Sequence, residues 1–219
     1  MNAFIAFIMG PMVWIAFLIF ILGLIFKLVV IIKDVNARES YVYSYLSVKY
    51  SLRSIFAWLI PFFPQSTRQS PVFYAISYIF HLLLFIVPVF LMSHIVLVNE
   101  AFQLSWFALD DTLADILTVI VVLALVFFAV RRQTVPEVKY LTSFNDYVLL
   151  IIVALPFITG FLAYHQFFFY RQMVIAHVIS GELVLILIPF SKFSHMVMAP
   201  LTRAYMGSEF GNVRHAKDW

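Results

Sequence analysis

Cysteine is absent from this sequence, and charged residues are scarce. Without cysteine, the chain itself can form no disulfide, no cysteine-ligated iron–sulfur cluster and no thiolate metal site. Asp, Glu, Lys and Arg make up 11% of the 219 residues, against roughly 25% in an average soluble domain. Hydrophobic residues make up 64%. No water-soluble fold could bury that much apolar surface, so the composition predicts an integral membrane protein.

The sequence also lacks a P-loop, a Rossmann glycine pattern, an internal repeat and a low-complexity tract. These absences argue against nucleotide-binding enzymes and repeat proteins, and we expect no nucleic-acid partner. Residues 1–219 are therefore predicted to form one membrane domain. The six histidines are the most available metal ligands. Any redox chemistry would therefore use a bound cofactor that histidine side chains hold.

Five stretches avoid charged residues for long enough to cross a bilayer, which takes about 20 apolar residues. They predict helices over residues 9–32, 72–98, 112–130, 147–168 and 172–198. Lys27 interrupts the first helix, where its long side chain can reach the interface, and Asp110 and Asp111 would suit the N-terminus of the third. The expected fold is an all-α integral membrane protein, a bundle of five transmembrane helices whose first helix is retained and not cleaved as a signal.

Basic residues accumulate in the cytoplasmic loops of membrane proteins. With the N-terminus outside and the C-terminus in the cytoplasm, only Arg171 of the 14 Lys and Arg residues falls on the outer side. The outer loop after the second helix instead collects Glu100, Asp110, Asp111 and Asp115. We therefore expect a multi-pass protein of the cytoplasmic membrane with this orientation.

The inner loop over residues 33–70 is long, and it contains an apolar segment, residues 51–63, that is too short to span the membrane. Pro61 and Pro64 interrupt this segment. Segments of this kind lie in the membrane interface or cover a partner protein. The alternative is a surface helix that only seals the bundle, and the sequence leaves both interpretations open.

Four of the six histidines fall inside predicted spans, where ionisable side chains are costly and often functional. His81 and His94 lie in the second predicted helix, and His177 and His195 lie in the fifth. These two helices run in opposite directions, so His81 and His195 share the inner level, whereas His94 and His177 share the outer level. The sequence therefore predicts two facing pairs of histidines.

Two imidazoles from facing helices can hold a haem iron between them, each using its other ring nitrogen for a hydrogen bond. On ideal helices His81 and His94 would be about 20 Å apart and His177 and His195 about 27 Å apart, so two stacked haems would roughly bridge the hydrocarbon core. His177 and His195, about five turns apart, would share one face. Gly181, one turn after His177, would leave room for a porphyrin.

Other interpretations stand beside the haem hypothesis. A single intramembrane histidine can be an ordinary packing residue, and on an ideal helix His81 and His94 point in different directions unless Pro88 kinks the helix. His165, at the outer end of the fourth helix, is the reserve ligand should His94 face away. We otherwise expect His165, and His215 in the polar tail, not to be ligands.

Three charged residues complete the candidate site. Arg171 at the outer end and Arg203 beyond the inner end could neutralise haem propionates, although each could equally serve as a topology or interface charge. Glu182 lies five residues after His177, and it must be neutral, hydrogen-bonded or paired because a lone buried charge is too costly. It is a candidate for proton relay or for contact with a quinone such as menaquinone, the alternative being a structural hydrogen bond to another helix.

The C-terminal stretch carries a spacing pattern that resembles the last helix of the respiratory nitrate reductase gamma-subunit family. The pattern consists of His177, Gly181, Pro189, Phe190, Ser191, Lys192 and His195. In that family five transmembrane helices hold two b haems through two histidines on helix two and two on helix five. The resemblance implies that His94 and His177 ligate an outer haem and His81 and His195 an inner one. The spacing of the helix-two histidines departs from the family pattern, and so does Glu182, where an apolar residue is expected.

A second set of residues resembles more closely the cytochrome b subunits of the sulfate reducers' membrane redox complexes, the high-molecular-weight cytochrome c complex and its tetrahaem-type relative. The set comprises the inner-loop stretch Arg53–Pro64, Phe80-His81, Pro88 and Ser93-His94. In those complexes a similar subunit joins a periplasmic multihaem cytochrome c to a cytoplasmic iron–sulfur protein similar to heterodisulfide reductase. The resemblance implies these partners, other membrane subunits and a place in anaerobic sulfate respiration.

Three functions follow as hypotheses. The first is a di-haem b subunit that passes electrons across the membrane between those partners and performs no independent catalysis. The second is a quinol-reactive or quinone-reactive cytochrome b subunit of a nitrate-reductase-like respiratory enzyme. The third, of another class, is a histidine-lined metal or proton transporter without haem.

Overall fold

The computed structural model describes residues 3–219, which form helices and turns and contain no strand. Within these residues five helices are long and apolar enough to cross a membrane. They are Ala3–Arg38, Pro71–Phe90, Asp111–Thr134, Phe144–Tyr164 and Tyr170–Leu187. The expected all-helical membrane class and the number of spanning helices are confirmed.

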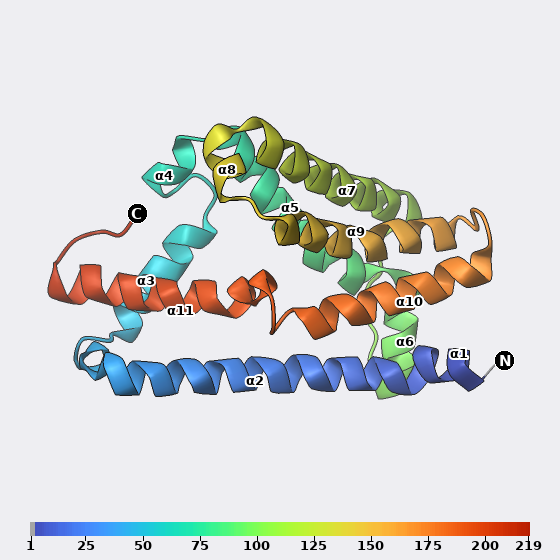
Figure 1. The fold of residues 1–219 in the computed structure, drawn as a ribbon, viewed down its shortest axis with the longest axis horizontal. Helices are drawn as coiled ribbons and strands as arrows, with labels where there is room; N and C mark the ends of the chain where they lie inside the picture. The colour runs from blue at the N-terminus through green and yellow to red at the C-terminus, as the bar shows by residue number, and fades with distance from the viewer. Residues whose placement is uncertain (1–2) are drawn as a thin grey trace. The chain divides into compact units, whose positions relative to one another are not determined.

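The first spanning helix consists of α1 (Ala3–Phe7), a π-helical turn (Ile8–Met12) and α2 (Val13–Arg38) (Figure 1). It therefore extends beyond the predicted range of 9–32 at both ends. A 3₁₀ turn (Ser40–Ser44) follows within the predicted inner loop.

The described chain forms two compact units, residues 3–9 with 75–181 and residues 10–74 with 182–219. In the first unit α7 (Asp111–Thr134) and α9 (Phe144–Tyr164) lie side by side (Figure 1). The Asp110 carboxylate accepts hydrogen bonds from the backbone N–H of Thr112 at 3.0 Å and of Leu113 at 3.3 Å, as expected for the start of this helix.

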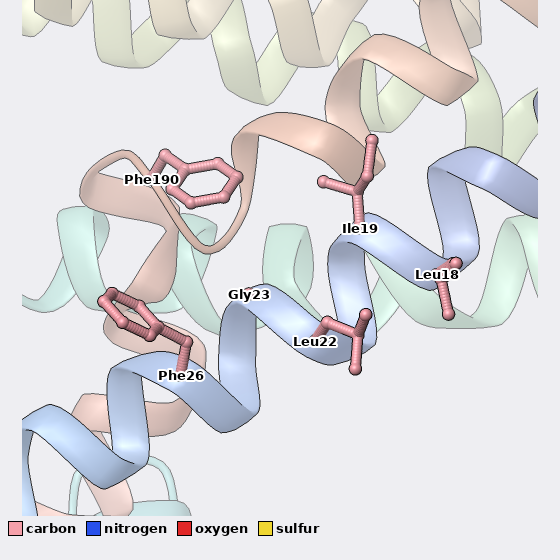
Figure 2. Close-up of a pocket in the computed structure, with 6 residues that line it drawn as sticks. All are labelled: Leu18, Ile19, Leu22, Gly23, Phe26 and Phe190. Carbon is pink, nitrogen blue, oxygen red and sulfur yellow. The ribbon is translucent and has the colours of Figure 1, made fainter.

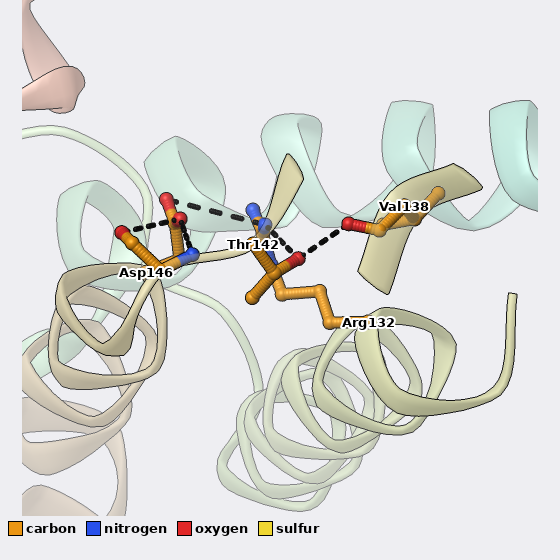
Figure 3. A network of polar contacts seen from close by, with 5 residues as sticks. Arg132, Val138, Thr142 and Asp146 are labelled. Atoms are coloured by element: carbon orange, nitrogen blue, oxygen red, sulfur yellow. Dashed lines mark hydrogen bonds and ion pairs between the residues drawn. The ribbon is translucent and has the colours of Figure 1, made fainter. Parts of the chain in front are cut away.

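A polar network connects the end of α7, the short helix α8 (Pro136–Leu141) and the start of α9 (Figure 3). Asp146, which is 4% exposed, accepts hydrogen bonds from the backbone N–H (2.8 Å) and hydroxyl (2.9 Å) of Ser143. The Arg132 guanidinium lies 4.0 Å from Asp146 and donates to the hydroxyl of Thr142 at 3.4 Å. The capping by Ser143 and Asp146 explains why the fourth spanning helix begins before the predicted residue 147.

In the second unit α3 (Val48–Leu59) packs across α11 (His195–Ser208) (Figure 1). Small residues allow this close approach, because a Cβ added to Gly207 would meet Tyr50 and Ser54. The Ser51 hydroxyl donates to the carbonyl of Ala204 at 3.1 Å. The apolar segment predicted over residues 51–63 thus belongs largely to α3, which ends before Pro61. The single turn α4 (Gln65–Arg68) follows.

Two of the predicted helices are interrupted. The predicted helix over 72–98 consists of α5 (Pro71–Phe90), the extended residue Leu91 (φ −71°, ψ 131°) and α6 (Met92–Phe102). The predicted helix over 172–198 ends as α10 (Tyr170–Leu187), and a 3₁₀ turn (Lys192–Ser194) precedes α11. The two continuous helices that we predicted are therefore wrong.

A proline lies close to each interruption. Pro88 lies inside α5 and weakens its preceding turn because it lacks an N–H, but the break itself is three residues later, at Leu91. Pro189 disfavours the helical conformation of the residue before it, and α10 ends two residues before Pro189.

Candidate functional site

The four predicted ligand histidines share one arrangement. In each, Nδ1 lies within hydrogen-bonding distance of a backbone carbonyl oxygen. The pairs are His81 with Ser77 (2.7 Å), His94 with Pro88 (2.7 Å), His177 with Pro156 (2.9 Å) and His195 with Lys192 (2.8 Å). A carbonyl oxygen can only accept, so Nδ1 must carry the proton and the lone pair of the neutral ring is on Nε2. This tautomer is the one that a histidine ligand with an ordered backbone partner presents to a metal.

His94 and His177 lie together in the first unit. Their ring centres are 5.8 Å apart, and the ring planes are inclined by 16°. Both side chains are half-buried. Neither Nε2 has a hydrogen-bond partner among the described residues. The predicted outer pair is therefore brought together, with two metal-ligating nitrogens available.

The separation of these rings suits a shared metal ion. Metal–nitrogen bonds are about 2 Å long, so two imidazoles that bind opposite sides of one ion place their ring centres roughly 6 Å apart. No group of three or more His, Asp and Glu side chains within residues 3–219 is placed to hold a metal. A haem iron needs only two axial ligands from the protein, because the porphyrin supplies the other four.

The break at Leu91 positions His94. In a continuous helix the carbonyls of residues 88–90 would accept hydrogen bonds from backbone N–H groups of the next turn, but the extended residue Leu91 separates α6 from α5. Three other donors take the place of those N–H groups. They are Nδ1 of His94 to Pro88 (2.7 Å), Nε1 of Trp106 to Val89 (3.0 Å) and the backbone N–H of Leu109 to Phe90 (2.9 Å). Membrane-buried backbone groups require such partners, so the break is a satisfied structural feature that also orients the imidazole.

His94 consequently lies in the first turn of α6 and not on the spanning helix α5, which is a correction to its predicted place. The mismatch in direction between His81 and His94 on one ideal helix no longer applies, because Leu91 separates the two helices.

His177, on α10, is held by α9. Its Nδ1 donates to the carbonyl of Pro156, and a Cβ added to Gly160 would lie 2.9 Å from its ring. The Ser180 hydroxyl donates to the carbonyl of His177 at 2.9 Å. Sequence reasoning missed Pro156 and Gly160. Their signal was a proline and a glycine one turn apart inside an otherwise apolar helix.

His81 and His195 belong to different units, so the structure describes each by itself, and their pairing stays a prediction. His81 is an exposed side chain of α5, and His195 is the exposed first residue of α11. Because the chain turns between α10 and α11, the expectation that His177 and His195 share one face of a single helix is wrong.

His165 differs from the four candidates because it uses Nε2, which lies 2.9 Å from the Asp115 carboxylate. This contact joins the C-terminal end of α9 to the first turns of α7. His215 is exposed in the C-terminal tail. The Nε2 atom of His165 therefore contacts Asp115. His94, and not the reserve candidate His165, lies beside His177.

The other predicted site residues have distinct surroundings. A Cβ added to Gly181 would meet nothing within 4 Å, so this position opens onto free space. Glu182 is 6% exposed, and its Oε1 has no hydrogen-bond partner among the described residues. Arg171 is exposed in the first turn of α10. The roles proposed for these three residues stay predictions.

Arg203 has partners within the second unit. Its guanidinium lies over the Trp58 ring, 4.4 Å from the ring centre, and 4.0 Å from the Asp218 carboxylate. Asp218 also accepts a hydrogen bond from the Ser54 hydroxyl. Binding of a haem propionate by Arg203, which stays a prediction, would have to compete with Asp218.

The helices and their composition define a multi-pass α-helical membrane protein. No family model and no solved structure matches this chain. A protein of Nitratidesulfovibrio vulgaris (strain Hildenborough), whose description names no activity, is 37% identical over 209 residues, which cover 94% of this chain and 92% of the relative. The chain belongs to the same family as this relative.

Proposed function

We propose that this protein is a membrane-embedded di-haem b subunit that passes electrons across the cytoplasmic membrane. The observation that carries the proposal is the pair of near-parallel imidazoles of His94 and His177, each anchored through Nδ1 to a backbone carbonyl. The free space at Gly181, one turn after His177, supports the fit of a porphyrin beside this pair.

The chain would supply the side chains that hold the haems. His94 and His177 would hold the outer haem, and His81 and His195 the inner one. A bound haem b supplies an iron that takes up and releases one electron. The backbone carbonyls fix the tautomer of each imidazole, so that Nε2 can ligate without a change in protonation.

Topology and partners complete the proposal. The charge distribution supports an N-terminus outside and a C-terminus in the cytoplasm. With that orientation the outer haem would exchange electrons with a periplasmic multihaem cytochrome c, and the inner haem with a cytoplasmic iron–sulfur protein. A reporter fused after Trp219 should be active only in the cytoplasm, and activity outside would require the assignment of haems to sides to be reversed.

A second candidate function is a quinol-reactive cytochrome b subunit, and Glu182 favours it. A buried carboxyl group with one oxygen unpartnered is unusual within a membrane helix, and it suits a group that exchanges protons or binds a quinone such as menaquinone. Replacing Glu182 with Gln should retain both haems. Unchanged quinol reactivity and unchanged pH dependence of the haem potentials would exclude this role.

The central experiment measures haem in the purified complex. We expect two protoporphyrin IX irons per chain by the pyridine haemochrome assay, with low-spin spectra. One haem per chain would mean that only one of the two histidine pairs binds a haem. No haem, with histidine-dependent transport of metal ions or protons, would favour the third hypothesis, a transporter.

A further inference from the structure

Lys27 of α2, whose side chain was expected to reach the membrane interface, has two hydrogen-bond acceptors within the second unit. Its side chain is half-buried, and Nζ donates to the Ser194 hydroxyl at 2.6 Å and to the Pro189 carbonyl at 3.3 Å. Both acceptors belong to residues 188–194, the interruption between α10 and α11. A lysine within a membrane helix is costly unless it has such partners, so these contacts account for its place there.

A second residue of α2 contacts the same interruption. Gly23 lies one turn before Lys27, and a Cβ added to it would be 2.6 Å from Cγ of Pro189. Figure 2 shows Gly23 on α2 between Leu22 and Phe26, with Phe190 of the interruption beside them. Residues of one face of α2 therefore supply both the space for the proline ring and the donor for its carbonyl.

The interruption also fixes the orientation of His195. The Lys192 carbonyl accepts from Nδ1 of His195, and Ser194, which directly precedes His195, accepts from Lys27. The 3₁₀ turn Lys192–Ser194 thus lies between the ammonium group and the imidazole. A change in the contacts of Lys27 would be transmitted to this ring through a single turn of backbone.

We propose that Lys27 is the positioning residue for the inner ligand His195, and that its positive charge raises the midpoint potential of the inner haem. The second part rests on the proposed function. A fixed cation favours the addition of an electron nearby, and this effect is stronger where water is excluded. Lys27 precedes Lys33, the next basic residue of α2, by six residues or about 9 Å of helix, so it acts from within the span.

Three variants and one control test the proposal in the complete complex. Lys27→Met removes the charge and both hydrogen bonds, whereas Lys27→Arg retains a charged donor. Ser194→Ala removes one acceptor and leaves the charge. Lys33→Met removes an exposed charge from the same helix and serves as the matched control.

The first measurement is backbone hydrogen exchange in the interruption, and it does not depend on haem. We expect Lys27→Met to speed exchange of the amides of residues 190–195, Ser194→Ala to do so to a smaller extent, and Lys27→Arg and Lys33→Met to leave it near the original rate. Unchanged exchange in Lys27→Met would overturn the positioning role, whether or not the protein holds haem.

The second measurement is a redox titration of the haems. Lys27→Met should lower the midpoint potential of the component that is lost in His195→Ala and leave the other component unchanged. Lys27→Arg should restore the original value. Faster exchange with both potentials unchanged would reduce Lys27 to a structural role, whereas an original protein without haem would refute the proposed function and leave the exchange result standing.

Discussion

The interruption at Leu91 and the interruption before His195 each place a histidine just after an apolar helix, but different parts of the chain satisfy their backbone groups. At Leu91 the replacement donors are His94, Trp106 and Leu109, all close in sequence. Before His195 the donor to the Pro189 carbonyl is Lys27, 162 residues away. The first interruption can therefore form from local sequence, whereas the second needs α2 in place.

The largest expected effect is the loss of one haem per chain. His94→Ala and His177→Ala should remove the same spectral component, and His81→Ala and His195→Ala should remove the other, because each change leaves one ligand facing an open position. Haem content and low-spin spectra of the purified complex measure this. If His81→Ala and His177→Ala abolish the same component, the assignment of ligands to the two haems must be redrawn.

Two glycines near His177 should respond in opposite ways. Gly160→Ala places a methyl group against the His177 ring, which should cost about 1–3 kcal/mol of stability. Gly181→Ala adds a methyl group to free space and improves helix propensity by up to about 1 kcal/mol.

The comparison sharpens the haem proposal, because a porphyrin that fills the space at Gly181 would be displaced by the added methyl group. We expect Gly181→Ala to lower haem content while leaving the thermal stability of haem-free protein unchanged or higher. Full haem content in Gly181→Ala, with a raised unfolding temperature, would show that the porphyrin does not use this space.

Trp106→Phe tests the first interruption. It removes the donor to the exposed Val89 carbonyl, and the loss of such a hydrogen bond costs about 0.5–1.5 kcal/mol. Thermal unfolding in detergent should show this loss, and Leu104→Ala, an exposed change in the same loop, should not. Equal unfolding temperatures for Trp106→Phe and the original protein would mean that water replaces the indole.

Ser191→Ala gives the smallest expected effect, at the second interruption. The Ser191 hydroxyl accepts from the backbone N–H of Phe193 at 3.2 Å, and loss of such a cap costs about 0.5–2 kcal/mol, with this single turn at the lower end. Ser191→Thr should retain most of the stability in the same unfolding measurement. An equal loss in both variants would attribute the effect to packing and not to the cap.

The number of spanning helices could be predicted from sequence because hydropathy reports directly on transfer into lipid. The start of α7 could be predicted as well, since Asp110 is a common capping residue at a helix start. The interruptions could not be predicted from hydropathy, because the apolar composition continues through Leu91 and Ile188. Pro88 and Pro189 were visible signals, but a proline in a membrane helix can kink it without ending it.

The candidate site was predictable in part. The four histidines could be selected because imidazoles are rare at membrane depth. The proximity of His94 and His177 was predicted from the opposite directions of the second and fifth helices, although His94 lies on α6 and not on the continuous helix that the prediction assumed. The Nδ1 partners depend on the exact path of the backbone, which a sequence pattern does not contain. The acceptors of Lys27 could not be predicted, because they lie in an interruption that the sequence did not reveal.

Helix α2 (Val13–Arg38) is 26 residues long and so measures about 39 Å along its axis. The hydrocarbon core is about 30 Å thick, and an ordinary tilt of about 20° takes up only a small part of the excess. Because Lys33, Asp34 and Arg38 occupy its last turns, the helix is a rigid arm that projects from the bilayer at this end. It carries Tyr41 and Tyr43, both exposed, beyond the lipid tails, where a water-soluble reagent can reach them from one side of a sealed membrane only.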